Sequence, residues 1–299
     1  MSKMNAPKEG LPTRADGDAL YLRTITEDVL GWTNPEARLR KALKEDQFLL
    51  YAQRIAGIKP RLADETALEV LLRLKEEEDN LLPPGGFFPV AEALGMLGEI
   101  DHWVIRKAIS WCSVDRDDVR APMCCINLSA DSLIDKEFPE RVRALLREHD
   151  LPGHRLCFEL EELDVLAHTA AVQQLIASLR PRGCKFALDN FGSVKVSFEH
   201  VRALPVDYLK VDGGMIQNIL KNPGDLARVK AISLTCQRLG MRVIASSVET
   251  QDILSKLREI SFDFAQGFGI ARPALLDSLR PAPAAAEPAA AAPPAGPAA

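Results

Sequence analysis

Several short apolar runs in this sequence contain or end in a polar residue whose side chain could bind a cation. Four of these residues offer oxygen ligands: Glu69, Asn127, Glu159 and Asp189. Oxygen ligands suit Mg²⁺, Mn²⁺ or Ca²⁺ better than zinc. Because a charged group inside an apolar strand is costly without a partner, the same carboxylates could instead form a buried network with Lys210 and Arg73. Position alone does not separate these two interpretations.

The stretch FALDNFGS, residues 186–193, contains the most informative of these positions. An apolar run leads to Asp189, and Asn190 follows where a second carboxylate would complete a cation-binding pair. The amide of Asn190 offers a carbonyl oxygen but no charge. The stretch is therefore consistent with a metal site that has lost one ligand, or with a site that never was catalytic.

The elements that would position these residues are short apolar runs separated by helical periods. The runs rich in β-forming residues are 48–56, 66–74, 122–129, 156–162, 185–191, 207–213, 242–248 and 262–270. Helical periods lie between most of them, at 89–112, 139–149, 168–182, 225–239 and 251–260. This alternation predicts a single (β/α)8 TIM-like barrel, in which function gathers at the C-terminal ends of the strands. No helix separates the first two runs, so we expect the first strand to be antiparallel.

The barrel domain is predicted to span residues 34–280. Asn34 and Pro35 resemble the N-cap and first residue of a helix. We expect residues 1–33 to form a partly disordered N-terminal extension. The Ala/Pro-rich segment 281–299 has no large apolar side chain to bury, and it is predicted to be a disordered tail.

Composition argues against several other classes of protein. The net charge is −5 and no basic stripe is present, so nucleic acid is not an expected partner. No apolar stretch approaches the roughly 20 residues of a membrane span, and the first residues lack the apolar core of a signal peptide. A cytoplasmic location is therefore expected. The six cysteines show no CxxC spacing and are predicted to be core residues.

Nine short motifs, in order, resemble those of the EAL domain, the bacterial cyclic di-GMP phosphodiesterase module, from about residue 36 to 276. They are LYAQRI for YxQPI, LEVLLR for EALLR, GFFPVAE for GFIPLAE, INLS for VNLS, FELEE for E-[IL]-T-E, ALDNFG for LDDFG, YLKVD for LKID, VIASSVET for VAEGVET and AQGF for AQGY. The resemblance implies the same barrel with an antiparallel first strand.

The resemblance also assigns roles to individual residues. The first-metal ligands fall on Glu69, Asn127, Glu159 and Asp189. The catalytic lysine falls on Lys210, and Glu162 falls on the glutamate that braces the loop after the fifth strand. The expected nucleotide contacts are Gln53, Leu72, Arg73, Asp212, Glu249, Gln266 and Phe268.

The departures from the family pattern concern mainly the second cation. Asn190 replaces the second Asp of DDFG, and Ser246 replaces the first Glu of AEGVE. The loop GTGYSS, which links metal occupancy to dimerisation in the family, has become GSVKVS at 192–197. Hydrolysis by two cations about 4 Å apart needs both of them, so these changes should remove catalysis more than recognition.

The resulting expectation is a degenerate EAL domain that binds cyclic di-GMP as a receptor with little or no phosphodiesterase activity. One Mg²⁺ or Mn²⁺ could remain, dispensable for nucleotide binding. The alternatives are a slow metal-dependent phosphodiesterase giving pGpG, and a protein-interaction scaffold that ignores the nucleotide. The tripeptide that gives the EAL domain its name is EVL here, at residues 69–71, and DHWVI stands at 101–105. Both motifs are similar to those of FimX-type receptors, and this likeness implies a PilZ-type partner. A homodimer is a further expectation from the family.

Overall fold

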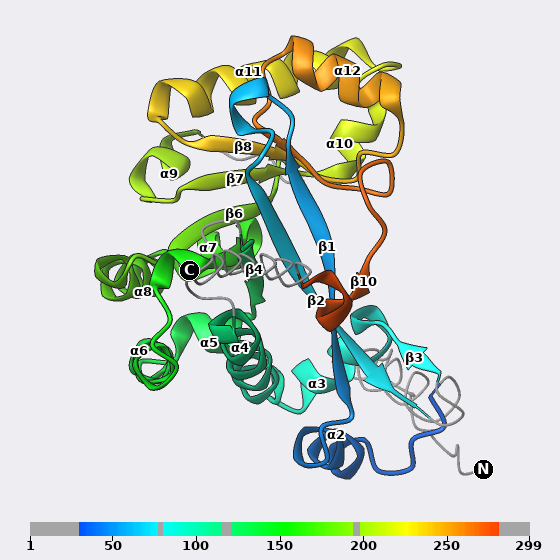
Figure 1. The fold of residues 1–299 in the computed structure, drawn as a ribbon, viewed down its shortest axis with the longest axis vertical. Helices are drawn as coiled ribbons and strands as arrows, with labels where there is room; N and C mark the ends of the chain where they lie inside the picture. The colour runs from blue at the N-terminus through cyan, green and yellow to red at the C-terminus, as the bar shows by residue number, and fades with distance from the viewer. Residues whose placement is uncertain (1–29, 77–79, 115–120, 194–197, 281–299) are drawn as a thin grey trace, which may run out of the picture.

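The computed structural model describes residues 30–76, 80–114, 121–193 and 198–280 (Figure 1). The predicted tail at 281–299 and residues 1–29 of the predicted extension lie outside this part of the chain. Within the extension, Trp32 is buried in the hydrophobic core, and the guanidinium carbon of Arg38 lies 5.8 Å from the centre of its ring.

The strands form a closed barrel, as predicted. Its members are β1 (Phe48–Gly57), β2 (Thr66–Lys75), β4 (Met123–Leu128), β5 (Leu156–Glu161), β6 (Lys185–Phe191), β7 (Tyr208–Val211), β8 (Arg242–Ala245) and β9 (Phe264–Ala265). With β3 left aside, strands β2 to β9 follow one another in parallel. Strand β1 closes the barrel by pairing antiparallel with both β2 and β9. The prediction of an antiparallel first strand is therefore confirmed. Short strands β3 (Leu81–Leu82) and β10 (Ala274–Leu275) pair with β2 and β1.

Helices lie around the strands (Figure 1). They are α2 (Pro35–Lys44), α3 (Pro84–Ala93), α4 (Leu97–Val114), α5 (Ala130–Ile134), α6 (Phe138–Glu148), α7 (Glu162–Ala167), α8 (Thr169–Leu179), α9 (Phe198–Ala203), α10 (Gly213–Asn218), α11 (Pro223–Leu239) and α12 (Gln251–Glu259). The cap predicted for the first helix is present, because Asn34 Oδ1 accepts a hydrogen bond from Ala37 N at 3.0 Å.

Two predicted elements differ in the structure. The helical period at 89–112 is two helices, α3 and α4, because Gly95 adopts a left-handed φ of 64° between them. The run at 262–270 contributes only Phe264–Ala265 as a strand. The chain then passes through Gly267, where a Cβ would lie 2.3 Å from backbone atoms of Val248, so this close approach requires glycine.

The barrel interior has an apolar half and a polar half. Alternate residues of each strand face inward. Near the N-terminal ends of the parallel strands, inward residues pack with Leu62, which lies between β1 and β2. The other members of this compact apolar cluster are Ile55, Ala67, Cys125, Cys157, Ala187, Ile244 and Phe264. Two positions further along β2, β4 and β5, the inward residues are Glu69, Asn127 and Glu159. A separate, larger core fills the space between strands and helices, and all six cysteines are buried.

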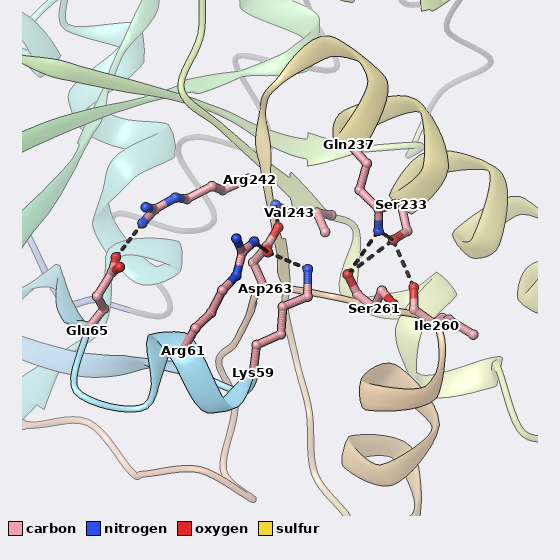
Figure 2. Close-up of polar contacts among 10 residues, drawn as sticks. All are labelled: Lys59, Arg61, Glu65, Ser233, Gln237, Arg242, Val243, Ile260, Ser261 and Asp263. Atoms are coloured by element: carbon pink, nitrogen blue, oxygen red, sulfur yellow. Dashed lines mark hydrogen bonds and ion pairs between the residues drawn. The ribbon is translucent and has the colours of Figure 1, made fainter.

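Asp263 ties the segment between β1 and β2 to the end of the barrel opposite the polar half (Figure 2). Its side chain is 5% exposed, and it accepts hydrogen bonds from Lys59 Nζ at 2.6 Å and from Val243 N at 3.0 Å. Arg61 lies 3.8 Å from the same carboxylate. One carboxylate thus links β8, the chain before β9, and the turn that follows β1.

Replacing Asp263 should destabilise the barrel without touching the polar half. Asp263→Ala leaves the amide of Val243 and the ammonium of Lys59 without their partner, which should lower the free energy of unfolding by about 2–3 kcal/mol. Urea unfolding measures this change. Asp64→Ala, at an exposed carboxylate in the same turn region, is the control and should stay within about 0.5 kcal/mol of the wild type. Equal effects of the two substitutions would contradict the assigned role.

No helix in the described ranges combines the length and the apolar composition that crossing a membrane requires.

Candidate functional site

The polar half of the barrel brings most of the sequence-predicted site residues together. Glu69, Glu159 and Asp189, on three different strands, each place a carboxylate oxygen within 4.8 Å of the other two. Asn127 donates its side-chain amide to Glu69 Oε1 at 2.9 Å. The four residues with oxygen ligands that the sequence predicted to lie together are therefore neighbours in the structure.

Lys210 lies at the centre of this cluster. Its Nζ is 2.6 Å from Glu159 Oε2, 3.2 Å from Glu69 Oε2 and 3.4 Å from Asp189 Oδ2. The side chain is only 3% exposed. The sequence left open a cation site or a buried ionic network with Lys210 and Arg73, and the structure shows the network around Lys210. Arg73 is not part of it, because its guanidinium contacts the carbonyl of Leu72 and the ring of Tyr51 instead.

The charges of this cluster are strongly coupled. Burial raises the pKa of Glu159 to about 8, against the attraction of Lys210 and with added repulsion from Glu69 and Asp189. Burial alone would lower the pKa of Lys210, but the carboxylates of Asp189, Glu159 and Glu69 outweigh it and hold that pKa well above its usual value. Lys210 is therefore a cation at every physiological pH.

The residues of this cluster fit one divalent cation. Glu159 is 1% exposed, and its Oε1 atom has no hydrogen-bond partner among the described residues. A buried carboxylate oxygen without a partner is costly, and a bound cation would remove that cost. Glu69, Glu159 and Asp189 would hold the ion, together with Asn127 if its amide presents the oxygen.

The two departures from the family pattern line the same cavity, which has a volume of about 250 Å³. Asn190 has a φ of 53° at an irregularity in the pairing of β6 with β7, and its backbone N–H donates to Asp189 Oδ1 at 2.8 Å. Ser246 directly follows β8. At these positions the cavity presents an amide and a hydroxyl rather than two carboxylates.

The predicted nucleotide contacts divide into two groups. Four of them line the cavity: Gln53, Glu249, Gln266 and Phe268. Gln266 donates to Gln53 Oε1 at 3.1 Å and also to Glu69. Phe268 is 58% exposed, with the guanidinium carbon of Arg272 5.0 Å from the centre of its ring. An exposed aromatic ring at the rim is suited to stacking.

The other three predicted contacts do not line this cavity. Leu72 is 5% exposed and belongs to the hydrophobic core. Arg73 donates to the carbonyl of Leu72 at 2.7 Å, and its guanidinium carbon lies 5.7 Å from the centre of the Tyr51 ring. Asp212 caps helix α10, accepting from Met215 N at 3.1 Å. Their contact with a nucleotide stays a prediction.

Glu162 contacts the loop that follows β6, the fifth strand of the barrel. It accepts hydrogen bonds from Gly192 N at 3.2 Å and from Ser193 Oγ at 3.5 Å. This is the contact expected of a bracing glutamate. Residues 194–197 of the altered loop at 192–197 lie outside the described residues.

Sequence reasoning missed two residues that line the cavity, Ser247 and Gly267. Gly267 could have been found, because glycine in an otherwise strand-like pattern often marks a close approach of two backbones. Ser247 carries no such signal. In a regular strand it would point away from the side that Ser246 faces, and only its φ of 55° brings it to the cavity.

Comparison with known proteins identifies the family. The EAL domain model matches residues 36–273. The chain belongs to the EAL family. Cyclic di-GMP phosphodiesterase PdeB of Shewanella oneidensis is 36% identical over 241 residues, which are 81% of this chain and 28% of PdeB. PdeF of Escherichia coli is 33% identical over 276 residues, 92% of this chain and 36% of PdeF. The chain thus spans about a third of the length of these relatives.

Two solved structures share the fold of this EAL domain. One is described as PaMucR phosphodiesterase in complex with c-di-GMP, with a TM-score of 0.76 and 27% identity; the match covers 82% of this chain and 99% of that one. The other is the FimX EAL domain from Pseudomonas aeruginosa bound to c-di-GMP, with a TM-score of 0.75 and 25% identity. That match covers 80% of this chain and 96% of the FimX domain.

Removing the ammonium of Lys210 should destabilise the EAL domain strongly. Lys210→Met leaves converging carboxylates without a counter-charge, at a cost of about 3–5 kcal/mol in the free energy of unfolding. The pKa of Glu159 would rise further above its unfolded value, so the folded variant binds more protons and loses stability as pH rises. Urea unfolding at pH 5 and pH 8 should therefore show the larger deficit at pH 8.

Lys185→Met is the matched control, since Lys185 pairs with Asp207 at 3.2 Å while 40% exposed and should contribute less than about 1 kcal/mol. Mn²⁺ should raise the melting temperature of Lys210→Met more than that of the wild type, because the ion restores the missing positive charge. A Lys210→Met protein as stable as Lys185→Met at both pH values would show that the network does not stabilise the fold.

Proposed function

We propose that this EAL domain is a cyclic di-GMP receptor with little or no phosphodiesterase activity. The observation that carries the proposal is the composition of the cavity. Beside the cluster of Glu69, Glu159 and Asp189, the positions expected to hold a second cation are Asn190 and Ser246. Two-cation hydrolysis needs both ions to activate water and to stabilise the leaving oxygen. A neutral amide and a short hydroxyl are poor substitutes for two carboxylates.

Electrostatics favours binding over hydrolysis in this cavity. Cyclic di-GMP carries two negative charges, and each carboxylate absent from the mouth removes a repulsion that a cation would otherwise have to neutralise. Lys210 already supplies a positive charge to the carboxylates that remain. The nucleotide therefore meets less repulsion here than at a site with two more carboxylates, and we expect it to bind without a second cation.

The volume of the cavity and the residues at its rim indicate how a dinucleotide would bind. A cavity of about 250 Å³ is smaller than a typical pocket for a whole ligand of this size, so much of the molecule must lie outside it. The exposed ring of Phe268 at the rim could stack on one guanine. Glu249, which is exposed and accepts a hydrogen bond from Gln217 at 3.1 Å, lies at the same rim.

A slow phosphodiesterase with a single cation is the second candidate function. It is favoured by the buried, unpartnered Oε1 atom of Glu159 and by the carboxylates of Glu69 and Asp189 beside it. An ion held there, Mg²⁺ or Mn²⁺, would supply Lewis-acid activation of water. Accumulation of pGpG with Mn²⁺, lost in Glu69→Ala, would favour this candidate.

A protein partner and self-association belong to the same proposal. The likeness of the signature to FimX-type receptors supports a PilZ-type partner, and membership of the EAL family supports a homodimer. A cytoplasmic location also remains a prediction.

Calorimetry with cyclic di-GMP tests the receptor proposal directly. We expect binding in EDTA and in Mg²⁺ with affinities within about threefold of each other, because no second cation is needed to hold the phosphates. Phe268→Ala should weaken binding about tenfold through loss of stacking. Leu234→Ala, at an equally exposed side chain on α11, is the control. Absence of binding in both conditions would refute the receptor.

Restoring the second-cation ligands should restore some hydrolysis. The double variant Asn190→Asp with Ser246→Glu adds the two carboxylates to a cluster that is already assembled, so pGpG should form in Mn²⁺ at least tenfold faster than in the wild type. Chromatography of the nucleotide measures this rate, and each single variant is the control. An unchanged rate would mean that the altered loop at 192–197, rather than the missing ligands, limits catalysis.

A further inference from the structure

Ser247 is held in a conformation that a serine seldom adopts. Its φ is 55°, in the left-handed region, where a side chain is strained and glycine is favoured. In the family motif VAEGVET, the residue at this position is glycine. This chain therefore carries a side chain, and its strain, at a place where a glycine would fit the backbone better.

The strained conformation brings two consecutive serines to the lining of one cavity. Successive residues of a strand normally face opposite sides. Ser246 and Ser247 nevertheless both line the cavity, because the chain leaves β8 at Ala245 and turns through the left-handed residue. Both serines are half-buried.

The hydroxyls of this serine pair are available to a ligand. Neither makes a hydrogen bond to another residue in the described part of the chain. The side chain of Ser247 packs against the start of α10, where a Cβ on Gly213 would lie 2.3 Å from Ser247 Oγ. Glycine at 213 thus makes room for this serine, whose position is limited before any ligand binds.

The charges of the cavity indicate which part of the nucleotide these hydroxyls meet. Carboxylates of Glu69, Asp189 and Glu249 line the same cavity, and the ammonium of Lys210 is already engaged by the first two. These carboxylates repel a phosphate, so a phosphate that enters the cavity should lie away from them, beside the serines. A serine hydroxyl can donate to its anionic oxygen in a charge-assisted hydrogen bond. Asn190 has a competing acceptor, the carboxylate of Glu161.

We propose that the hydroxyls of Ser246 and Ser247 bind a phosphate oxygen of cyclic di-GMP directly, in place of a second cation. This inference rests on the receptor function proposed above and names the groups that make metal-free binding work. The strain at Ser247 is then part of the binding site, since in a relaxed strand Ser247 would face away from the side that Ser246 faces.

The proposal predicts that stability and affinity change in opposite directions in one variant. Ser247→Gly relieves the strain and should raise the melting temperature by about 2 °C. The same variant loses a hydroxyl and should bind cyclic di-GMP about tenfold more weakly in EDTA. Ser247→Ala should weaken binding to the same extent without the gain in melting temperature, because the strained Cβ remains.

Ser261→Gly is the matched control. Ser261 also has a left-handed φ, 63°, but it lies near the Asp263 network at the other end of the barrel, where its carbonyl accepts from Ser233 and Gln237 (Figure 2). Its substitution should raise the melting temperature and leave affinity unchanged. The ³¹P resonances of the bound nucleotide should shift in Ser247→Gly and not in Ser261→Gly.

The outcomes separate this inference from the receptor function. Wild-type binding that Ser247→Gly leaves intact would overturn the serine site alone. Weaker binding with unchanged ³¹P resonances would overturn phosphate as the group contacted and would indicate the sugar or the base. A wild type that does not bind the nucleotide in any condition would refute both proposals together.

Discussion

The buried ammonium of Lys210 is the interaction on which the polar half of this barrel depends. Three carboxylates from three different strands converge on it at hydrogen-bonding or ion-pair distance. Without that charge their mutual repulsion and desolvation would oppose closure of the barrel at this end. The same lysine thus makes it possible for an otherwise apolar fold to keep a charged cluster inside.

The apolar packing of the barrel interior is separated from the cavity along the barrel axis. The interior near the N-terminal ends of the parallel strands is apolar, and Asp263 links three segments of chain at that end. The interior at the opposite end is polar and opens into the cavity. Substitutions at the cavity, such as those that place Asn190 and Ser246 there, can therefore accumulate without affecting the packing that holds the strands together.

The departures at the cavity change its electrostatics more than its shape. Asn190 and Ser246 reduce the negative charge of the mouth, and Ser247 adds a second hydroxyl next to the first. Hydrolysis needs concentrated positive charge from cations, which carboxylates must hold. Binding of an anion needs only donors and the absence of repulsion, and the same scaffold can provide these with neutral side chains.

The sequence by itself determined the elements of the barrel and the residues of the central cluster. Strand runs, the antiparallel first strand and the cap at Asn34 follow from local patterns. Because parallel strands present their C-terminal ends together, Glu69, Glu159 and Asp189 could be grouped from their positions in the chain alone. The break at Gly95 and the shortness of β9 lay beyond these patterns, since helical periodicity continues across a break and apolar residues also pack outside strands.

Only the tertiary structure decided that Lys210 balances the charge of this cluster, and that both Ser246 and Ser247 line the cavity beside it. The pattern left a cation site and an ion network equally open, because it does not give the distance from Lys210 to each carboxylate. The resemblance placed Leu72 among the ligand contacts, and its side chain lies in the hydrophobic core, so that contact stays a prediction. Ser247 reaches the cavity through one backbone dihedral angle, and the side-chain alternation of strands cannot predict a residue that departs from it.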